Sequence, residues 1–470
     1  MPTSTSLSKS SDARSSENKP RVLFLASDCN PQWHSLPALI AEYFRSLIDY
    51  ADLTLVTHVR NRENLESWLP DFVTVRYIDN EKLARPLYKL TRWLTGDPNK
   101  ALTLQVALSY PSNIYFEYCV WREFKAELQA GEYDIVHRGS PMSPTIPSPM
   151  AKWSPVPFVI GPVLGGLPWP KQFKGEMRRE GEWMNYFRAA HKCLPYYSST
   201  YKYASAILAG YAHTMGDIPK RDSDRVVEFS EGGIHPEDFP ERVFSSLEEE
   251  SGLGGAEEKA TILFVGRLVP FKQPEVLIRC VEKSDVLKKH RLVIVGDGPE
   301  LPRLRSLVKA LGLEKYIELT GTLPIEEVRG LMYQSDIFAF PSIREQGGGV
   351  LTMASMASVP CVVVDYGGPS CRVPNGCGKR IPLGPVESII DGFVTALEAM
   401  VEDREGTCRL GIAARKFTQQ FYSWEWKAKK TAEIYDWVLG GRPIKPDFWS
   451  EDVGAKADNS IVGRASRISF

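Results

Sequence analysis

Residues 261–268 read TILFVGRL, and residues 291–298 read RLVIVGDG. Each is a short apolar run that reaches a glycine, and a helix-like stretch separates the two. Three further runs follow, YIELTG at 316–321, DIFAFPS at 336–342 and PCVVVDY at 360–366. Short apolar runs that alternate with helices are typical of strands buried on both faces of a parallel sheet. This part of the chain therefore predicts a doubly wound α/β domain.

The same alternation occurs earlier in the chain, from RVLFLAS at residues 21–27 to SAILAG at 205–210. Between the halves lies SSLEEESGLGGAEEK, residues 245–259, which is acidic, contains glycine and has few large apolar residues. Such a change of composition predicts a seam between domains. We expect the fold class α/β, with two doubly wound parallel-sheet (Rossmann-like) domains that face each other across a cleft. Open sheets of this kind bind ligands at the carboxyl ends of their strands.

The predicted organisation follows from where the strand–helix alternation begins, breaks and stops. The Ser- and charge-rich N-terminus and the last residues lack periodicity, so both ends are predicted to be disordered. The predicted parts are a tail at 1–20, an N-terminal acceptor-binding domain at 21–240, a linker at 241–259, a C-terminal nucleotide-sugar-binding domain at 260–422, a helix that crosses back at 423–446 and a second tail at 447–470.

Composition excludes several classes of protein. The 470 residues include 57 Lys plus Arg and 58 Asp plus Glu, for a net charge of -1, which argues against a protein that mainly coats nucleic acid. The 8 cysteines are scattered without a C-x-x-C pair, as fits a reducing compartment. There is no apolar signal segment and no apolar stretch of about 18 residues. We therefore expect a cytoplasmic protein, with peripheral contact to a membrane left open.

A glycine-rich loop within AFPSIREQGGGVLTMASMASVPCVVVDYGGP, residues 339–369, is the most informative segment. Gly347, Gly348 and Gly349 precede a predicted helix, so the backbone can approach a ligand closely and the helix N-terminus can bind phosphate. Glu345 beside this site would repel phosphate, and we expect it to accept hydrogen bonds from the hydroxyls of an attached sugar. A plain strand–helix turn with a glutamate cap is the alternative.

Two cations follow the first strand of the same half. Arg267 and Lys272 lie in FVGRLVPFKQPEVLIRC, residues 264–280, and two cations at the mouth of an α/β cleft suit a diphosphate. Two solvated surface cations are the alternative. The segment VIVGDGPELPRL, residues 293–304, has Leu301 at the third position of the dinucleotide fingerprint, so no nicotinamide cofactor is expected.

Taken together, these motifs resemble the donor-binding domain of GT-B glycosyltransferases of family 4, the retaining group also called glycosyltransferase group 1. The motif order G-R-L…K, V-G-D-G-P…L, L-T-G, D-I-F-A-F-P-S…E and V-D-Y-G-G-P is similar to that family across residues 261–385, and a looser likeness extends over residues 20–440. The resemblance implies a retaining, metal-independent transferase that moves a sugar from a nucleotide-diphosphate donor to an acceptor. It implies a carbohydrate or lipid-linked acceptor, work in polysaccharide or glycolipid synthesis, and no cofactor besides the nucleotide sugar.

The resemblance also assigns roles to single residues. Arg267 and Lys272 would hold the diphosphate, and Glu345, as the first carboxylate of the family's E-x7-E motif, would contact the sugar. Met353 stands where that motif has its second carboxylate, which usually binds the ribose, and a thioether accepts hydrogen bonds only weakly. Losing such a bond costs about 1.5–3 kcal/mol, so weaker donor binding is expected. The implied donor-binding set is Gly266, Gly321, Leu323, Gly347, Gly348, Gly349, Val350 and Met353.

The acceptor side gives weaker signals. Its candidates lie in loops or strand ends of the N-terminal half and are Asn30, His34, His137, Arg138 and Gly161. Residues 81–100, EKLARPLYKLTRWLTGDPNK, are basic and aromatic enough to contact an anionic surface, with a solvated helix face as the alternative reading.

Two other functions stay open at this point. One is a non-catalytic GT-B protein that serves as a binding or partner subunit, for which Met353 is the evidence. The other is a different GT-B enzyme, such as a sugar-nucleotide epimerase or a phosphorylase.

Overall fold

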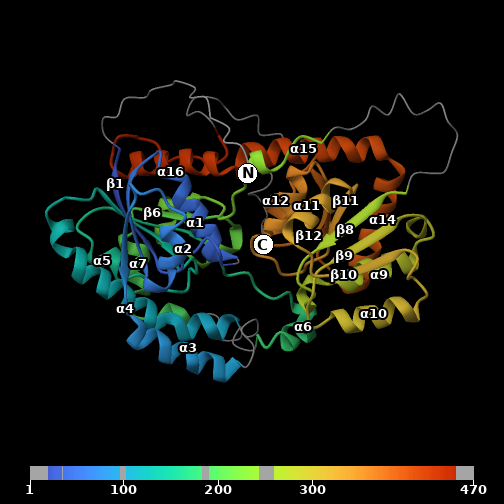
Figure 1. Ribbon diagram of the computed structural model, residues 1–470, viewed down its shortest axis with the longest axis horizontal. Helices are drawn as coiled ribbons and strands as arrows, with labels where there is room; N and C mark the ends of the chain where they lie inside the picture. Colours follow the sequence, from blue (N-terminus) through green and yellow to red (C-terminus); the bar gives the residue numbers. More distant parts are fainter. Residues whose placement is uncertain (1–18, 34, 96–101, 183–189, 243–258, 451–470) are drawn as a thin grey trace, which may run out of the picture.

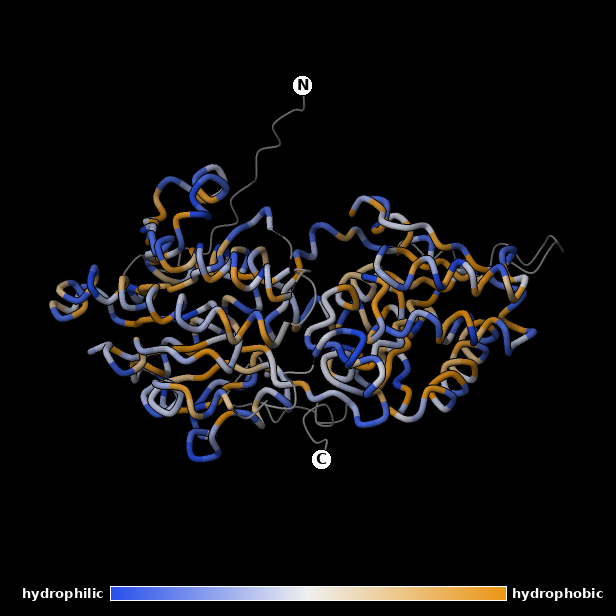
Figure 2. The backbone as a smooth tube through the Cα atoms, turned by 90° about the horizontal axis from the view of Figure 1, so that it is seen from below, coloured by the Kyte–Doolittle hydropathy of each residue, from blue (hydrophilic) through white to orange (hydrophobic). Residues whose placement is uncertain are grey.

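The computed structural model describes residues 19–33, 35–95, 102–182, 190–242 and 259–450 of the chain. Two lobes lie side by side, and each is built around one parallel β-sheet with helices on both faces (Figure 1). Apolar segments are concentrated inside both lobes (Figure 2). The predicted fold class, two doubly wound domains, is confirmed.

The sheet of the N-terminal lobe has the strand order β3-β2-β1-β4-β5-β6-β7 within the described residues. Its strands are β1 (Arg21–Ala26), β2 (Asp52–His58), β3 (Thr74–Ile78), β4 (Ile135–Ser140), β5 (Phe158–Val163), β6 (Ala206–Ala209) and β7 (Val226–Glu228). Side chains alternate across a strand, and in β1 Val22 and Phe24 enter one core while Leu23 and Leu25 enter the other. The continuous apolar sequence of this strand therefore reflects burial on both faces.

The sheet of the C-terminal lobe has the order β10-β9-β8-β11-β12-β13 within the described residues. Its strands are β8 (Thr261–Val265), β9 (Arg291–Val295), β10 (Ile317–Gly321), β11 (Ile337–Phe340), β12 (Cys361–Asp365) and β13 (Gly378–Pro382). A Cβ atom at Gly296 would lie 2.0 Å from the carbonyl oxygen of Gly266, and one at Gly298 would lie 2.4 Å from that of Leu268. The glycines of the V-G-D-G motif thus let the loops after β8 and β9 pack backbone against backbone.

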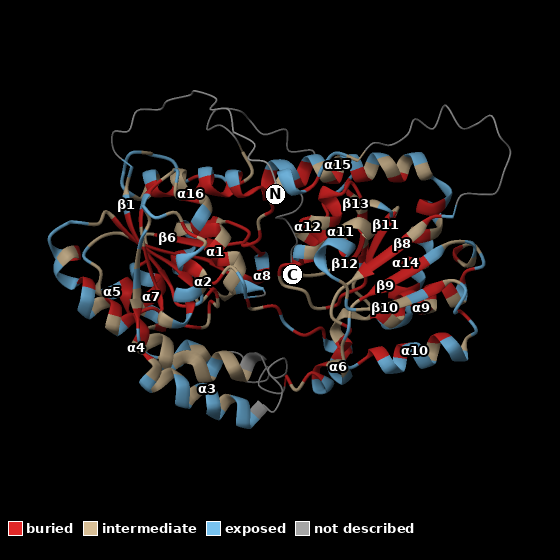
Figure 3. Cartoon of the chain, viewed as in Figure 1, coloured by how far each residue is buried: buried red, intermediate tan, exposed pale blue. Residues whose placement is uncertain are grey.

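Helices cover the strands, which form the buried centre of each lobe (Figure 3). None of the described helices is long and apolar enough to cross a membrane. Helices α1 and α16 pack on one face of the N-terminal sheet, and α4, α5 and α7 pack on the other. The helices are α1 (Leu36–Ser46), α2 (Arg62–Glu66), α3 (Glu81–Thr95), α4 (Leu102–Gln129), α5 (Met150–Trp153), α6 (Lys174–Arg179), α7 (Tyr197–Tyr203), α8 (Ala212–Asp217), α9 (Pro274–Lys283), α10 (Leu301–Ala310), α11 (Ile325–Tyr333), α12 (Gly349–Met356), α13 (Gly368–Arg372), α14 (Val386–Glu402), α15 (Arg404–Tyr422) and α16 (Trp424–Val438).

The chain crosses back to the N-terminal lobe between α15 and α16, along the upper edge of Figure 1. Helix α15 packs along α12, and α16 packs along α1. Ser423 separates the two helices, and its hydroxyl accepts a hydrogen bond from the Trp426 N–H at 3.2 Å. The predicted crossing helix is therefore present as α16, which ends at Val438. The prediction of a disordered tail from residue 447 was wrong for its first residues, because Phe448 is 1% exposed and packs against Phe229.

A segment of the N-terminal half, residues 164–182, reaches across to the C-terminal lobe, and we call it the strap. Trp169, Phe173 and Met177 are buried in the core of the C-terminal lobe, and α6 lies on that side of the molecule (Figure 1). The predicted domain at 21–240 is thus not one contiguous unit. The strap binds there because its three large apolar side chains find cover only against the other lobe.

Candidate active site

The two predicted functional loops meet where the strand order of the C-terminal sheet reverses, between β8 and β11. Lys272 follows β8 and Glu345 follows β11, and the Lys272 Nζ lies 2.7 Å from the Glu345 Oε2. The two side chains are 15% and 19% exposed, so the pair is sheltered but reachable. The Lys272 Nζ also lies 4.7 Å from the ring centroid of Phe340. A charged pair is therefore held at the topological switch point, where such sheets bind ligands.

Arg267 lies two residues beyond β8 and is partly exposed. Among the described residues, its guanidinium has no ion pair or hydrogen bond, whereas its carbonyl accepts one from the Val269 N–H at 3.0 Å. The neighbouring Gly266 leaves room for the Lys272 stem, since a Cβ there would lie 3.3 Å from Cδ. The guanidinium is thus available to an anion beside Lys272.

The glycine loop leads into helix α12 as the sequence predicts. Gly348 has φ 70° and precedes the first helical residue, Gly349, and no side chain caps the helix. A Cβ at Gly347 would lie 2.2 Å from the Glu231 Oε1, so only glycine fits. The first N–H groups of a helix have no partner within it. Those of Gly349 and Val350, the latter half-buried, therefore form a donor set for an anion next to Glu345.

Met353 lies one turn into α12 and packs in a small apolar cluster with Ile234, Phe239 and Met356. Ile234 and Phe239 belong to the segment that enters the C-terminal lobe from β7. The side chain therefore supports the connection between lobes and offers no oxygen to a ribose.

Two further predicted donor residues lie at the same edge of the C-terminal sheet. The carbonyl of Gly321 accepts a hydrogen bond from the Gly296 N–H at 2.8 Å, and Leu323 packs against the C-terminal core. Nothing in these contacts tests whether either residue binds a donor.

Four acceptor-side predictions need correction, beginning with His137. This residue is fully buried in β4, where Nε2 donates to the Gly161 carbonyl at 2.8 Å and Nδ1 accepts from the Tyr435 hydroxyl at 2.6 Å. Burial lowers the pKa of His137 to about 4. The imidazole is therefore a neutral structural bridge between β5 and α16, and the prediction that it contacts an acceptor was wrong.

Arg138 and Gly161 are likewise interior. The Arg138 guanidinium donates to the carbonyl oxygens of Pro141 and Ile146, both at 2.9 Å, and lies 3.8 Å from the Glu117 carboxylate. Gly161 has φ 129°, and a Cβ there would lie 2.5 Å from the Leu208 carbonyl oxygen. Arg138 therefore shapes the loop after β4, and Gly161 allows close strand packing.

Asn30 and His34 follow β1. Asn30 is buried, and its amide donates to the Asn61 Oδ1 at 3.3 Å and accepts from the Asn64 Nδ2 at 3.0 Å. It therefore fixes neighbouring side chains and does not face the cleft. The prediction for His34 lies outside the described residues.

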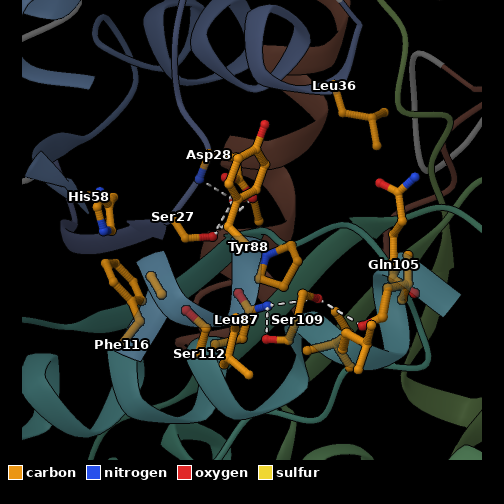
Figure 4. A pocket seen from close by; sticks show the side chains of 18 of the residues that line it. Ser27, Asp28, Leu36, His58, Leu87, Tyr88, Gln105, Ser109, Ser112 and Phe116 are labelled. Carbon is orange, nitrogen blue, oxygen red and sulfur yellow. Dashed lines mark hydrogen bonds between the residues drawn. The ribbon is translucent and has the colours of Figure 1, made fainter. Parts of the chain in front are cut away.

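A cavity of about 410 Å³ lies at the switch point of the N-terminal sheet, between the ends of β1 and β4 (Figure 4). The sequence analysis missed it. The ends of strands β1 to β4 supply its polar floor, and helices α3 and α4 form its roof. The polar residues include Asp28, His58, Arg60, Asn61 and Asn80, and the apolar ones include Leu36, Leu87 and Phe116.

Several polar groups of the cavity are held in place, and others are unused. The Asp28 N–H donates to the Ser140 Oγ at 3.0 Å, which ties the two switch-point loops together. His58 interacts with the Asn80 side chain, and its Nε2 lies 3.7 Å from the Glu81 Oε1. Neither His58 Nε2 nor Asn80 Oδ1 makes a hydrogen bond of normal length within the described residues. Burial raises the pKa of the Asp28 carboxyl, although a bond from Ser27 opposes the shift. A buried polar group without a partner is costly, so the floor favours a ligand with hydroxyl groups.

Helix α3 also exposes aromatic and basic side chains, and Tyr88 both lines the cavity and borders these exposed groups. Trp93 is 79% exposed and Tyr88 is more than half exposed, while Arg85 and Lys89 line a shallow depression beside Tyr88. No group of three or more His, Cys, Asp or Glu side chains suited to a metal ion occurs in the described part of the chain.

Comparison with known proteins finds a family model that matches part of the chain. Residues 247–417 match the family model described as glycosyl transferases group 1. The phosphatidylinositol N-acetylglucosaminyltransferase GPI3 subunit of Saccharomyces cerevisiae is 27% identical over 181 residues, which are 38% of this chain and 39% of that protein. A D-inositol 3-phosphate glycosyltransferase of Corynebacterium efficiens is 30% identical over 217 residues, 43% of this chain and 46% of that protein. The chain thus spans less than half the length of these two relatives.

Solved structures establish the fold. Sucrose-phosphate synthase from Thermosynechococcus elongatus superposes with a TM-score of 0.58 at 15% identity, over 90% of this chain and 100% of that one. Anabaena HepE in complex with UDP and glucose gives a TM-score of 0.52 at 17% identity, over 88% and 98%. The two-lobed architecture is that of the GT-B glycosyltransferases.

Proposed function

We propose that this chain transfers a sugar from a nucleotide-diphosphate donor to an acceptor hydroxyl, with retention at the anomeric carbon and without a metal ion. The Lys272–Glu345 pair, 2.7 Å apart beside the glycine loop, is the observation that carries the proposal. The phosphates of a sugar diphosphate need a cation, and its sugar hydroxyls need a hydrogen-bond acceptor. This pair offers both. The match to group 1 glycosyl transferases over the same residues supports it.

The donor side stabilises the departing diphosphate. Lys272 and the unpaired Arg267 neutralise its charge, and the first N–H groups of α12 bind its oxygens. Preorganised donors of this type usually supply the largest part of a rate enhancement. Glu345 accepts hydrogen bonds from sugar hydroxyls and keeps Lys272 in place before the donor arrives.

Transfer then needs no protein nucleophile. The acceptor oxygen attacks the anomeric carbon from the face that the diphosphate leaves. The new bond joins that oxygen to the sugar, the bond to the phosphate oxygen breaks, and the acceptor proton passes to the departing phosphate. Apposition of the two lobes excludes water, which protects the donor from hydrolysis.

The N-terminal cavity binds the acceptor. Asp28 accepts a hydrogen bond from the reacting or a neighbouring hydroxyl, and the His58 and Asn80 side chains bind others. Leu87, Val106 and Phe116 give the roof an apolar part, which lies among polar side chains of the same two helices. A polyhydroxylated ring attached to an apolar chain fits both parts, and the names of two similar proteins contain inositol or phosphatidylinositol. We therefore favour a glycolipid acceptor over a free polysaccharide.

Helix α3 brings the protein to that acceptor. Its Tyr88 lies beside Arg85 and Lys89, and Trp93 is exposed on the same helix. Exposed aromatic and basic side chains on one helix are a combination that binds anionic bilayer surfaces. The protein then acts at the cytoplasmic face of a membrane as a peripheral protein.

Met353 supports a second candidate, a GT-B subunit that binds a partner without catalysis. Its side chain is committed to the apolar cluster with Ile234 and Phe239, where the family's ribose-binding carboxylate is absent. The experiment below separates this candidate from the enzyme.

Calorimetric titration with UDP-, GDP- and ADP-sugars tests the proposal. We expect saturable binding of one nucleotide, weakened at least about tenfold in Arg267→Ala and Glu345→Ala because each removes a charged partner. Arg291→Ala is the matched control, since Arg291 pairs with Glu318 at the opposite end of the same sheet. Binding that Arg267→Ala leaves unchanged would contradict the donor site. Binding that appears only in Met353→Glu would support the non-catalytic subunit.

A further inference from the structure

Arg372, the last residue of α13, lies beneath the glycine loop and is 4% exposed. Its Nε donates to the carbonyl oxygen of Gly347, and its Nη1 donates to the Thr352 Oγ1 of α12 at 2.7 Å. Two donors of one guanidinium therefore hold the loop and the helix that follows it.

The remaining donors of Arg372 reach the other lobe and the segments between lobes. Nη2 lies 3.2 Å from the Tyr211 hydroxyl and 3.2 Å from the Glu231 Oε1. Tyr211 directly precedes α8 in the N-terminal lobe, and Glu231 follows β7 on the way into the C-terminal lobe. Tyr422, at the end of α15, lies with its ring centroid 4.7 Å from the guanidinium carbon. One side chain thus touches the donor loop, the N-terminal lobe and both crossings.

Small residues make this convergence possible. A Cβ at Gly347 would lie 2.2 Å from the Glu231 Oε1, and one at Gly232 would lie 2.7 Å from the Arg372 Nη2. Lys427 of α16 is buried in the same place, with its Nζ 2.5 Å from the Ser230 carbonyl oxygen. The crossing segment and the donor loop therefore fit together only around this arginine and its partners.

The direction of the Gly347 carbonyl decides what the loop offers to a ligand. In a trans peptide the carbonyl and the next N–H point in opposite directions. Because Arg372 holds the Gly347 oxygen, the Gly348 N–H points away from the guanidinium. Gly348 borders Glu345, since a Cβ at Gly348 would lie 3.6 Å from the Glu345 Cγ.

We propose that Arg372 is a positioning residue that makes the shape of the donor loop depend on contact between the two lobes. Tyr211 and Glu231 orient the guanidinium, and the guanidinium in turn orients Gly347. Separation of the lobes removes Tyr211, one of the two groups that orient the guanidinium, and leaves the carbonyl freer to turn toward the ligand. The ligand part of this inference rests on the proposed function, because it assumes that the loop binds a nucleotide diphosphate.

The test uses a residue of the other lobe. Tyr211→Phe removes one hydroxyl and leaves every donor-side residue intact. Tyr43→Phe is the matched control, because Tyr43 is also buried in the N-terminal lobe and its hydroxyl bonds to Thr431 of α16 at 2.8 Å. Calorimetry measures affinity for UDP, GDP and ADP, and hydrogen exchange measures protection of the amides at 347–351.

We expect Tyr211→Phe to weaken binding of the preferred nucleotide about three- to tenfold and to speed exchange at 347–351, as loss of one buried hydrogen bond predicts. Tyr43→Phe should do neither, even where its melting temperature falls equally. Arg372→Lys should weaken binding further, since one ammonium group cannot reach the four oxygen atoms to which the planar guanidinium donates.

Two results would overturn the inference. Equal exchange in the two tyrosine variants would show that the loop does not sense the other lobe. Unchanged nucleotide affinity in Arg372→Lys would show that the arginine is only structural. If the wild type binds no nucleotide, the proposed function fails, and the exchange comparison still decides whether the lobes and the loop are coupled.

Discussion

The two proposed sites are built in different ways. The proposed donor site consists of backbone from the glycine loop and of Arg267, Lys272 and Glu345, which lie in the loops that follow β8 and β11. The cavity proposed for the acceptor collects side chains that follow four strands and adds a roof from α3 and α4. A donor site of this kind recognises charge through local motifs, whereas the acceptor site recognises shape through tertiary packing.

The largest expected effect is on the donor side. Lys272→Met should lower kcat about 100- to 1000-fold, because it removes a preorganised cation from the departing diphosphate. Lys283→Met is the control, since Lys283 pairs with Glu387 and Asp391 on the outer surface of α9. Steady-state rates with saturating donor measure the difference. A loss of kcat below about threefold would show that Lys272 does not contact the diphosphate.

The next largest effect is expected on the pH dependence of stability, through His137 in the N-terminal lobe. Burial lowers the pKa of His137 from 6.5 to about 4, so the folded state binds fewer protons than the unfolded state between these values. The contribution of His137 to the free energy of unfolding should therefore be present in full above about pH 6.5. The free energy of unfolding should fall by roughly 3 kcal/mol as the pH drops to about 4. Urea unfolding of the wild type and of His137→Gln isolates this contribution, because the variant lacks the titration. Parallel pH curves would contradict it.

Asp28 should control the acid side of the rate profile. Its raised pKa means that the carboxyl takes up a proton at a higher pH than an ordinary aspartate does. If the ionised carboxylate accepts a hydrogen bond from the hydroxyl of the acceptor, kcat/KM should fall as the pH drops through this pKa. Asp28→Asn should abolish this acid limb of the pH profile and lower kcat/KM by about ten- to a hundredfold. A pH profile that Asp28→Asn does not change would exclude this role.

Filling the cavity should give the smallest effect. Gln105→Trp places an indole among the lining residues of α4 and should raise the acceptor KM by about tenfold without changing the donor KM. Ala107→Trp is exposed on the same helix and does not line the cavity, so its kinetic constants should match the wild type. Equal effects of the two substitutions would place the acceptor elsewhere.

The same contrast explains how much of each proposed site could be predicted from the sequence. Lys272 and Glu345 are 73 residues apart, yet both follow strands, and the carboxyl ends of parallel strands meet at one edge. His137 also belongs to such a strand, but it points toward Tyr435 of α16, and the position of that helix is not encoded near β4. The roof of the cavity depends on how α3 folds against α4. Met353 could be recognised as a departure from a motif, whereas its packing against Ile234 and Phe239 required the structure.

The strap has a consequence for engineering new donor specificities. Exchange of the C-terminal half at a single junction between residues 242 and 259 would leave Trp169, Phe173 and Met177 of the host facing a foreign surface. Arg344 would lose the Trp169 ring that lies 4.9 Å from its guanidinium carbon, next to Glu345. A working chimera must therefore carry residues 164–182 with the incoming half and keep α16 with the host. The residues that have to be exchanged together to change the proposed donor specificity are therefore not contiguous in the sequence.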